Sequence, residues 1–317
     1  MKKDDTECRL CPRNCGTLRQ EGKKGYCGAT GEILIARAAP HFWEEPCISG
    51  TKGSGAVFFS GCNLHCVYCQ NKEISDGDKG KAVSAERLAE IFLELQEKNV
   101  YNINLVTPTH YADKIRESLM LAKNNGLHIP VVYNCSGYER KETVGMLSDC
   151  IDIWMPDFKY ISPETAQRYS NCPDYFEIAA CALDEMVRLT KLKGGTLISE
   201  EPADFRNSEC DKEEIMKRGV IVRHMMLPGR TGESKRILRF LKERYGNDIY
   251  ISIMSQYTPM PQIMKDERFP ELRQKVDRND YDRLVDFAVS IGIENAFIQE
   301  EDVATESFIP AFDGEGV

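Results

Sequence analysis

Residues 61–70 read Gly-Cys-Asn-Leu-His-Cys-Val-Tyr-Cys-Gln and come just after an apolar stretch, residues 55–59. The three cysteines of this segment, Cys62, Cys66 and Cys69, have the spacing C-x3-C-x2-C. Iron–sulfur clusters that only carry electrons are usually held by four cysteines. Three thiolates can hold three irons of a four-iron cluster and leave the fourth iron open. The triplet therefore predicts a [4Fe-4S] cluster whose open iron binds a substrate or cofactor.

Two other interpretations of the triplet are a zinc site and three buried, unliganded thiols. Zinc sites mostly use four ligands in paired C-x2-C spacings, and the triplet offers one such pair. The spacing therefore favours the cluster over either alternative.

The triplet, with Tyr68 just before its third cysteine, resembles the signature of the radical S-adenosylmethionine (radical SAM) enzymes. In that family the open iron binds the amino and carboxylate groups of S-adenosylmethionine. One electron from the cluster then cleaves the sulfonium to methionine and a 5′-deoxyadenosyl radical. The resemblance implies a [4Fe-4S] cluster and S-adenosylmethionine as cofactors. It also implies a low-potential electron donor, such as flavodoxin or ferredoxin, as a partner.

The composition limits where the protein works and what it binds. The 317 residues carry a net charge of −9, which argues against broad non-specific binding to nucleic acid or to an anionic membrane. No stretch approaches the roughly 18 apolar residues that span a bilayer, and the N-terminus lacks a signal peptide. We therefore expect a cytoplasmic protein. In such a chain, the 13 cysteines favour metal binding over disulfides.

The pattern along the chain changes near residue 50. Residues 1–50 are rich in cysteine and glycine with little periodicity, which predicts a small, loop-rich N-terminal segment. In residues 51–317 strands and helices alternate, which predicts an α/β fold. The expected strands are 56–60, 102–106, 129–133, 151–155, 220–226, 250–254 and 296–298. The expected helices are 84–96, 112–124, 139–147, 174–192, 234–245 and 281–290.

Six or seven such units predict a partial TIM-like (β/α)6 barrel, which is also the fold that the radical SAM resemblance implies. A doubly wound open sheet is the alternative. In a barrel of this kind the chemistry lies at the C-terminal ends of the strands. Polar residues that follow the predicted strands are therefore candidates for binding S-adenosylmethionine.

Several further motifs lie along nearly the whole chain: Cys-Pro-Arg-Asn-Cys at 11–15, Ala-Pro-His-Phe-Trp-Glu-Glu-Pro at 39–46, Gln70-Asn71 after the triplet, Asp157-Phe-Lys159, and Phe-Ile-Pro-Ala-Phe-Asp at 308–313. With these motifs the chain resembles the pyruvate formate-lyase-activating-enzyme-like (PflX-type) branch of the radical SAM proteins. Glycyl-radical activating enzymes usually carry Gly-Gly-Glu after the second strand, where it meets the methionine ammonium. This chain has Thr107-Pro-Thr instead, so Thr107 is the candidate for that role. After the third strand, Asn134 and Ser136 are candidates for the methionine carboxylate or the ribose. A turn that satisfies only its own backbone is the alternative for these two.

Two further strand ends carry charged residues. Pro156-Asp-Phe-Lys159 resembles the Asp-x-Lys motif of activating enzymes, and Asp157 and Lys159 share one face of a strand. Asp157 would suit the sulfonium or another cation, and Lys159 a carboxylate. Arg223, on the fifth strand, would suit a carboxylate because its rigid donors form a fork. A solvated surface pair is the alternative for Asp157 and Lys159.

A second set of cysteines precedes the triplet: Cys8, Cys11, Cys15 and Cys27, spaced C-x2-C-x3-C-x11-C. Four thiolates at these spacings could bind zinc or a second cluster. The alternative is a reduced, unliganded loop. Activating enzymes with ferredoxin-like inserts carry their extra cysteines after the radical triplet, whereas here they come before it.

The resemblance leaves the substrate open. The first hypothesis is an activating enzyme that makes a glycyl radical on a partner protein. The second is a radical enzyme that directly modifies a small molecule, a peptide or RNA. The missing Gly-Gly-Glu and the displaced cysteines favour the second. A non-catalytic metal-binding protein is the third.

Overall fold

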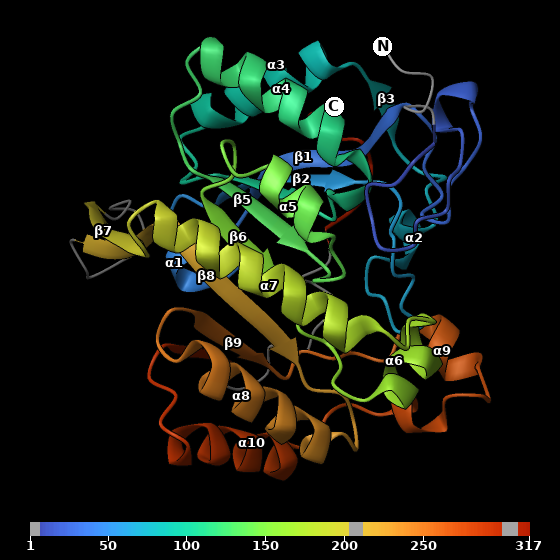
Figure 1. The fold of residues 1–317 in the computed structure, drawn as a ribbon, viewed down its shortest axis with the longest axis vertical. Helices are drawn as coiled ribbons and strands as arrows, with labels where there is room; N and C mark the ends of the chain where they lie inside the picture. The colour runs from blue at the N-terminus through green and yellow to red at the C-terminus, as the bar shows by residue number, and fades with distance from the viewer. Residues whose placement is uncertain (1–6, 203–211, 300–309) are drawn as a thin grey trace.

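A sheet of ten strands forms the centre of the described part of the chain, residues 7–202, 212–299 and 310–317 of a computed structural model (Figure 1). Seven strands run parallel, and each lies beside the next one along the chain. Their bounds are β2 Ser54–Phe59, β4 Ile103–Val106, β5 Val131–Cys135, β6 Ile153–Pro156, β8 Lys212–Met225, β9 Tyr250–Met254 and β10 Ala296–Ile298. A doubly wound sheet would reverse this order at one point. The observed order agrees with the predicted partial TIM-like barrel.

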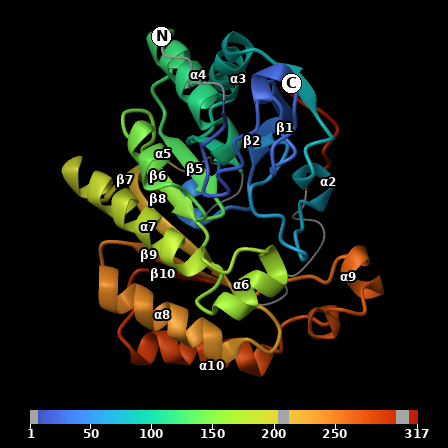
Figure 2. The ribbon, with the colours of Figure 1, turned by 45° about the vertical axis from the view of Figure 1, so that its right-hand side comes forward.

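Six helices connect these parallel strands, close to their predicted positions: α3 Ala85–Glu97, α4 Ala112–Asn124, α5 Lys141–Met146, α7 Tyr175–Leu192, α8 Thr231–Tyr245 and α10 Arg278–Ser290. Figures 1 and 2 show the longer of them along the outside of the sheet. Helix α3 illustrates why they form, because Ser84 accepts the backbone N–H of Arg87 and caps the first turn. Its apolar side chains at three- and four-residue spacing are buried. Among the described residues, no helix has the length and apolar composition that crossing a bilayer requires.

The shorter elements fill the loops. The α-helical ones are α1 Pro46–Ser49, α2 Lys72–Ser75, α6 Pro163–Ser170 and α9 Pro261–Lys265. The 3-10 turns are η1 Arg19–Glu21, η2 Thr109–Tyr111 and η3 Pro270–Arg273. Strand β7, Leu197–Pro202, pairs antiparallel with the first half of β8 and forms a two-stranded extension at that end of the sheet. Helix α6 and strand β7 were not predicted.

The expectation that residues 1–50 are loop-rich is wrong for residues 33–41. This segment forms strand β1, Ile33–His41, which pairs antiparallel with β2 and, on its other side, with β3, Lys81–Val83. An irregularity in the pairing between Ile35 and Arg37 interrupts the two-residue alternation. Consecutive residues are therefore buried, and the sequence shows no strand periodicity.

The turn after β5 requires glycine at position 137. Gly137 has φ of +76°, and a Cβ atom there would lie 2.1 Å from the backbone oxygen of Asp157, at the end of β6. The close approach brings the ends of β5 and β6 together, which is where the predicted site residues lie.

We expect Gly137→Ala to lower the free energy of unfolding by roughly 3 kcal/mol or more, because it adds both backbone strain and a steric overlap. The matched control is Gly232→Ala in α8, where nothing lies within 4 Å of the added Cβ. That change should leave stability equal or slightly higher. Denaturant unfolding of both variants measures the difference, and equal midpoints would contradict this account of the turn.

Candidate functional site

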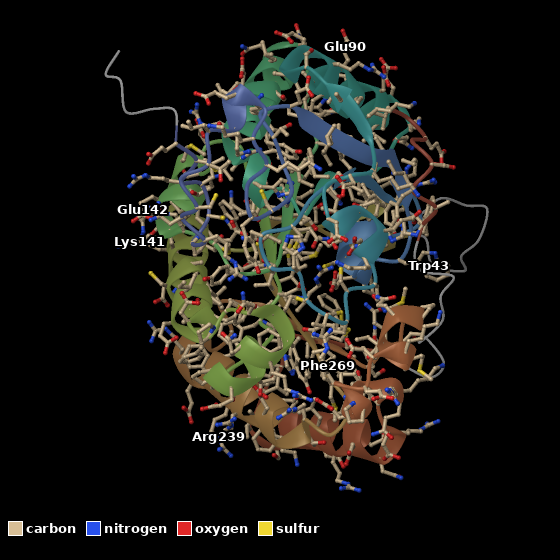
Figure 3. The ribbon with its side chains drawn as sticks, turned by 90° about the vertical axis from the view of Figure 1, so that its right-hand side faces the viewer. Trp43, Glu90, Lys141, Glu142, Arg239 and Phe269 are labelled. Carbon is tan, nitrogen blue, oxygen red and sulfur yellow. The ribbon has the colours of Figure 1, made fainter. Side chains whose placement is uncertain are left out.

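One cavity at the C-terminal ends of the parallel strands is lined by all nine residues predicted for the cluster and for S-adenosylmethionine. These residues are Cys62, Cys66, Cys69, Thr107, Asn134, Ser136, Asp157, Lys159 and Arg223. They come from the loops that follow β2, β4 and β6, from the end of β5 and the turn after it, and from β8. Trp43, at the surface of the molecule (Figure 3), also lines the cavity. The structure thus brings the nine residues together; their roles as ligands remain a prediction.

The triplet loop turns sharply and supplies hydrogen-bond donors to its own sulfurs. His65, between the first two cysteines, has φ of +54°, in the left-handed region. The backbone N–H of Leu64 donates to Cys62 Sγ at 3.4 Å. Burial raises the pKa of Cys62 to about 11 and that of Cys69 to about 12. Without a bound cation, these two thiols would therefore stay protonated at neutral pH.

A chain of buried hydroxyl groups ends on Cys66. Ser170 Oγ, at the end of α6, donates to Cys66 Sγ at 3.0 Å. The hydroxyl of Tyr160 lies 2.7 Å from Ser170 Oγ, and that of Tyr68 lies 2.7 Å from Tyr160. All four residues are buried. Hydrogen bonds to sulfur stabilise a thiolate ligand, so this chain fits Cys66 as a cluster ligand.

The described residues contain no preformed group for a single metal ion. Across residues 7–202, 212–299 and 310–317, no three cysteine, histidine or carboxylate groups lie close enough to hold a single metal ion. Thiolates that each bind a different iron of a four-iron cluster do not converge on one point. A [4Fe-4S] cluster held by the triplet would not require its three sulfurs to surround one point.

Charged side chains from three segments of the chain meet in the wall of the same cavity. Asp157 accepts from Lys159 Nζ at 2.7 Å and from Arg223 Nε at 3.1 Å. Arg223 also donates to Glu44 Oε2 at 3.2 Å and to Asn134 Oδ1. The alternative of a solvated surface pair is therefore wrong for Asp157 and Lys159, because both side chains are more than four-fifths buried.

The pKa values of the two carboxyl groups in this network shift in opposite directions. Burial alone would raise the pKa of Asp157, but Lys159 and Arg223 together hold it below its ordinary value. Burial raises the pKa of Glu44, and Arg223 opposes that shift only in part. Asp157 is therefore the firmly ionised partner of the two cations.

Sequence reasoning missed Glu44. It follows β1 and accepts hydrogen bonds from the amides of Asn104 at 3.0 Å and Asn134 at 3.4 Å. The neighbouring helix α1 carries Cys47, which packs with Ile48 in a buried cluster on strands β5, β6 and β8. Glu44 thus reaches the cavity from the loop after an antiparallel strand. The rule that active-site residues follow the parallel strands does not cover this loop.

Thr107 occupies an unusual backbone position. Its φ is +59°, which is uncommon for a β-branched residue, and its N–H donates to the backbone oxygen of Asn134 at 2.9 Å. A conformation of this kind costs about 1–3 kcal/mol and is concentrated at functional sites. Thr109 instead turns away and donates to the buried Glu139 at 2.6 Å.

The N-terminal cysteines are not among the residues that line the cavity. Cys11 and Cys27 are buried, Cys8 is half-buried and Cys15 is exposed. They lie behind the triplet loop, because the backbone N–H of Cys62 donates to the backbone oxygen of Cys27 at 3.0 Å.

Part of the chain matches a known protein family. Residues 56–188 match the Radical SAM superfamily, a range that runs from β2 into α7 and contains the triplet. Uncharacterized protein MJ0674 of Methanocaldococcus jannaschii is 24% identical over 299 residues, which cover 90% of this chain and 75% of that protein. Uncharacterized protein MJ0808 of the same organism is 23% identical over 210 residues, 60% of this chain and 58% of the relative.

A crystal structure of Streptococcus suis SuiB is similar in fold. SuiB bound to precursor peptide SuiA has a TM-score of 0.50 and 11% identity, covering 75% of this chain and 46% of SuiB. SuiB bound to S-adenosylmethionine has a TM-score of 0.47 and 10% identity, covering 75% and 48%. This chain thus spans about half the length of SuiB. The matches do not single out the pyruvate formate-lyase-activating branch.

We expect Asp157→Asn to lower the free energy of unfolding at pH 7 by about 3–5 kcal/mol, because it leaves two largely buried cations without their shared carboxylate. The contribution of Asp157 is present above about pH 4 and is lost as the pH falls, since the folded pKa lies below the unfolded one.

The matched control is Asp248→Asn, which removes the exposed ion pair with Lys191 and should cost far less. Urea unfolding at pH 7 and at pH 3 measures both effects. If the two variants lose equal stability at pH 7, the buried network does not stabilise the fold.

Proposed function

We propose that this chain, whose residues 56–188 form a radical SAM superfamily domain, is an enzyme that acts on its substrate through S-adenosylmethionine. The observation that carries the proposal is that the cysteine triplet and the charged strand-end residues line one cavity. Cys62, Cys66 and Cys69 would hold a [4Fe-4S] cluster. That group, with S-adenosylmethionine bound beside it, supplies a 5′-deoxyadenosyl radical that abstracts a hydrogen atom from the substrate.

The residues around the triplet would bind and orient the parts of S-adenosylmethionine. The ammonium group of Lys159 would bind the methionine carboxylate. The carboxyl groups of Asp157 and Glu44 would bind the methionine ammonium and stabilise the sulfonium. Arg223 bonds both carboxylates and Asn134, and so fixes their positions. Ser136, half-buried beside Asn63, offers a hydroxyl group suited to a carboxylate or a ribose.

We further propose that the chain modifies its substrate directly rather than activating a glycyl radical enzyme. Thr107, in a left-handed conformation, stands where activating enzymes carry Gly-Gly-Glu, and the additional cysteines precede the triplet. The fold likeness to SuiB in its complex with precursor peptide SuiA makes a peptide the first substrate class to test. A flavodoxin or ferredoxin in the cytoplasm would supply the electron.

The proposal predicts that the anaerobically reconstituted, dithionite-reduced chain forms 5′-deoxyadenosine from S-adenosylmethionine. Cys66→Ala should reduce this activity to background, because it removes a cluster ligand. Cys150→Ala, at a buried cysteine outside the cavity, should retain it. Cleavage is followed by chromatography at several concentrations of candidate peptides. Full cluster loading without cleavage in any condition would contradict the proposal.

Arg223→Lys tests the positioning of the two carboxylates. Lysine keeps the positive charge but lacks the forked donors of the guanidinium group, so at least one charge-assisted hydrogen bond of about 1.5–3 kcal/mol is lost. We expect kcat/KM for S-adenosylmethionine to fall by about 10- to 100-fold. The control is Arg244→Lys, in an exposed pair with Asp184, which should leave the kinetics unchanged. Wild-type kinetics for Arg223→Lys would remove Arg223 from the proposed site.

A further inference from the structure

The N-terminal cysteines lie in turns of the same kind as those of the triplet. The backbone N–H groups of Arg13, Thr17 and Ala29, each two positions after a cysteine, are placed to stabilise the thiolates of Cys11, Cys15 and Cys27 respectively. In the triplet, Leu64 N–H donates to Cys62 Sγ at 3.4 Å, and Asn71 N–H stands in the same relation to Cys69. Backbone donors of this kind hold a thiolate in place and compensate its charge when it ligates a metal.

Glycines make these turns possible. Gly16 follows Cys15 with φ of +64°, and Gly28 follows Cys27 with φ of +79°, so both lie in the left-handed region. At Gly25 a Cβ atom would lie 3.4 Å from Cys27 Sγ and 3.5 Å from Cys15 Sγ. The absent side chain leaves open the space between these two sulfurs.

The other two thiols lie beside the same pair. The buried Arg19 places Nη1 3.7 Å from Cys8 Sγ and also interacts with Cys27. Cys11 is buried, and Cys27 and Cys8 lie within electrostatic range of its thiol. Thr17 Oγ1 donates to Cys15 Sγ at 3.3 Å. Each of the four sulfurs therefore has at least one other as a neighbour, and each is within reach of a hydrogen-bond donor.

Packing alone does not account for this arrangement. Residues 7–32 contain one short 3-10 turn, η1, and no strand, so this segment has little apolar core of its own. Cys15 is exposed and Cys8 only half-buried, so neither gains much from burial. Loop-rich segments of this size usually need a metal or disulfides to become ordered.

We propose that Cys8, Cys11, Cys15 and Cys27 form a second metal centre, an iron–sulfur cluster with four thiolate ligands. Thiolates that each bind a different iron need not meet at one point, which agrees with the absence of a group for a single metal ion among the described residues. The metal-binding part of this inference does not depend on the proposed function, because the four ligands lie outside the cavity.

This centre is placed to fix the triplet loop. The backbone oxygen of Cys27 accepts the backbone N–H of Cys62 at 3.0 Å, and Arg13 Nε donates to the backbone oxygen of Asn63 at 2.9 Å. His65 Nε2 lies 2.9 Å from the backbone oxygen of Tyr26. Figures 1 and 2 show the N-terminal loops on the side of α2, the helix that follows the triplet. Ordering residues 8–27 around a metal would therefore order the loop that carries the radical cluster.

The experiment uses the full chain with Cys62, Cys66 and Cys69 changed to Ser, so that any remaining metal belongs to the second centre. It is prepared in two ways, with zinc and by anaerobic reconstitution with iron and sulfide. We expect about four irons per chain with a similar amount of sulfide after reconstitution. About one zinc per chain, with the intense thiolate-to-cobalt absorption after cobalt substitution, would instead show a mononuclear centre and contradict the cluster.

In that background, Cys11→Ser with Cys27→Ser should remove the metal. The matched pair Cys150→Ser with Cys181→Ser, which lie outside both sets, should keep it. Since Cys11 and Cys27 are buried, Cys15→Ser provides a variant at an exposed position, and it should lower metal retention against a chelator while circular dichroism stays unchanged. Two results would overturn the proposal. One is a folded Cys15→Ser variant that retains its metal as well as the parent chain does. The other is a chain without the triplet that binds no metal in either preparation.

Discussion

The buried ion pair between Asp157 and Arg223 is the interaction on which the rest of the cavity depends. It joins the end of β6 to β8, and the backbone N–H of Phe158 donates to the backbone oxygen of Arg223 beside it. In a largely buried network, removing one of the charged groups leaves the charge of its partner uncompensated, which is strongly destabilising. Lys159 and Glu44 complete that balance on either side of the pair. The network therefore holds three elements in register around the space that faces the cysteine triplet.

The other wall of the cavity depends on atoms that lie far away in the sequence. Ser170, which donates to Cys66, is 104 residues from it, and Tyr160 and Tyr68 extend the chain of hydroxyls. Hydrogen bonds to a ligating sulfur are among the factors that set the reduction potential of a cluster. Helix α6 thus has an electronic role in the proposed enzyme as well as a structural one.

Much of the fold was predictable because each strand and helix of the barrel has its own local pattern. The apolar runs of β2, β5 and β9 and the three- and four-residue spacing in α3 can be read without tertiary information. The strand-end rule then placed Thr107, Asn134 and Asp157 in one cavity. Strand β1 could not be read, because the irregularity near Arg37 breaks the alternation.

Glu44 and Ser170 were not predictable for a different reason. Glu44 reaches the cavity from the loop after an antiparallel strand, and Ser170 ends a helix of eight residues, too short for its pattern to stand out in the sequence. Their roles arise only when distant segments meet. The cysteine spacings, by contrast, are local, and they led directly to the triplet loop and to the turns at Cys11, Cys15 and Cys27.

The central claim is that the triplet and the charged network form one site for S-adenosylmethionine. It is tested most directly by the electron paramagnetic resonance spectrum of the reduced, reconstituted chain with and without S-adenosylmethionine. The account predicts that the ligand changes the spectrum of the wild type and that Asp157→Asn or Arg223→Lys weakens this change. A spectrum that is the same with and without saturating S-adenosylmethionine, in protein with a fully loaded cluster, would contradict it.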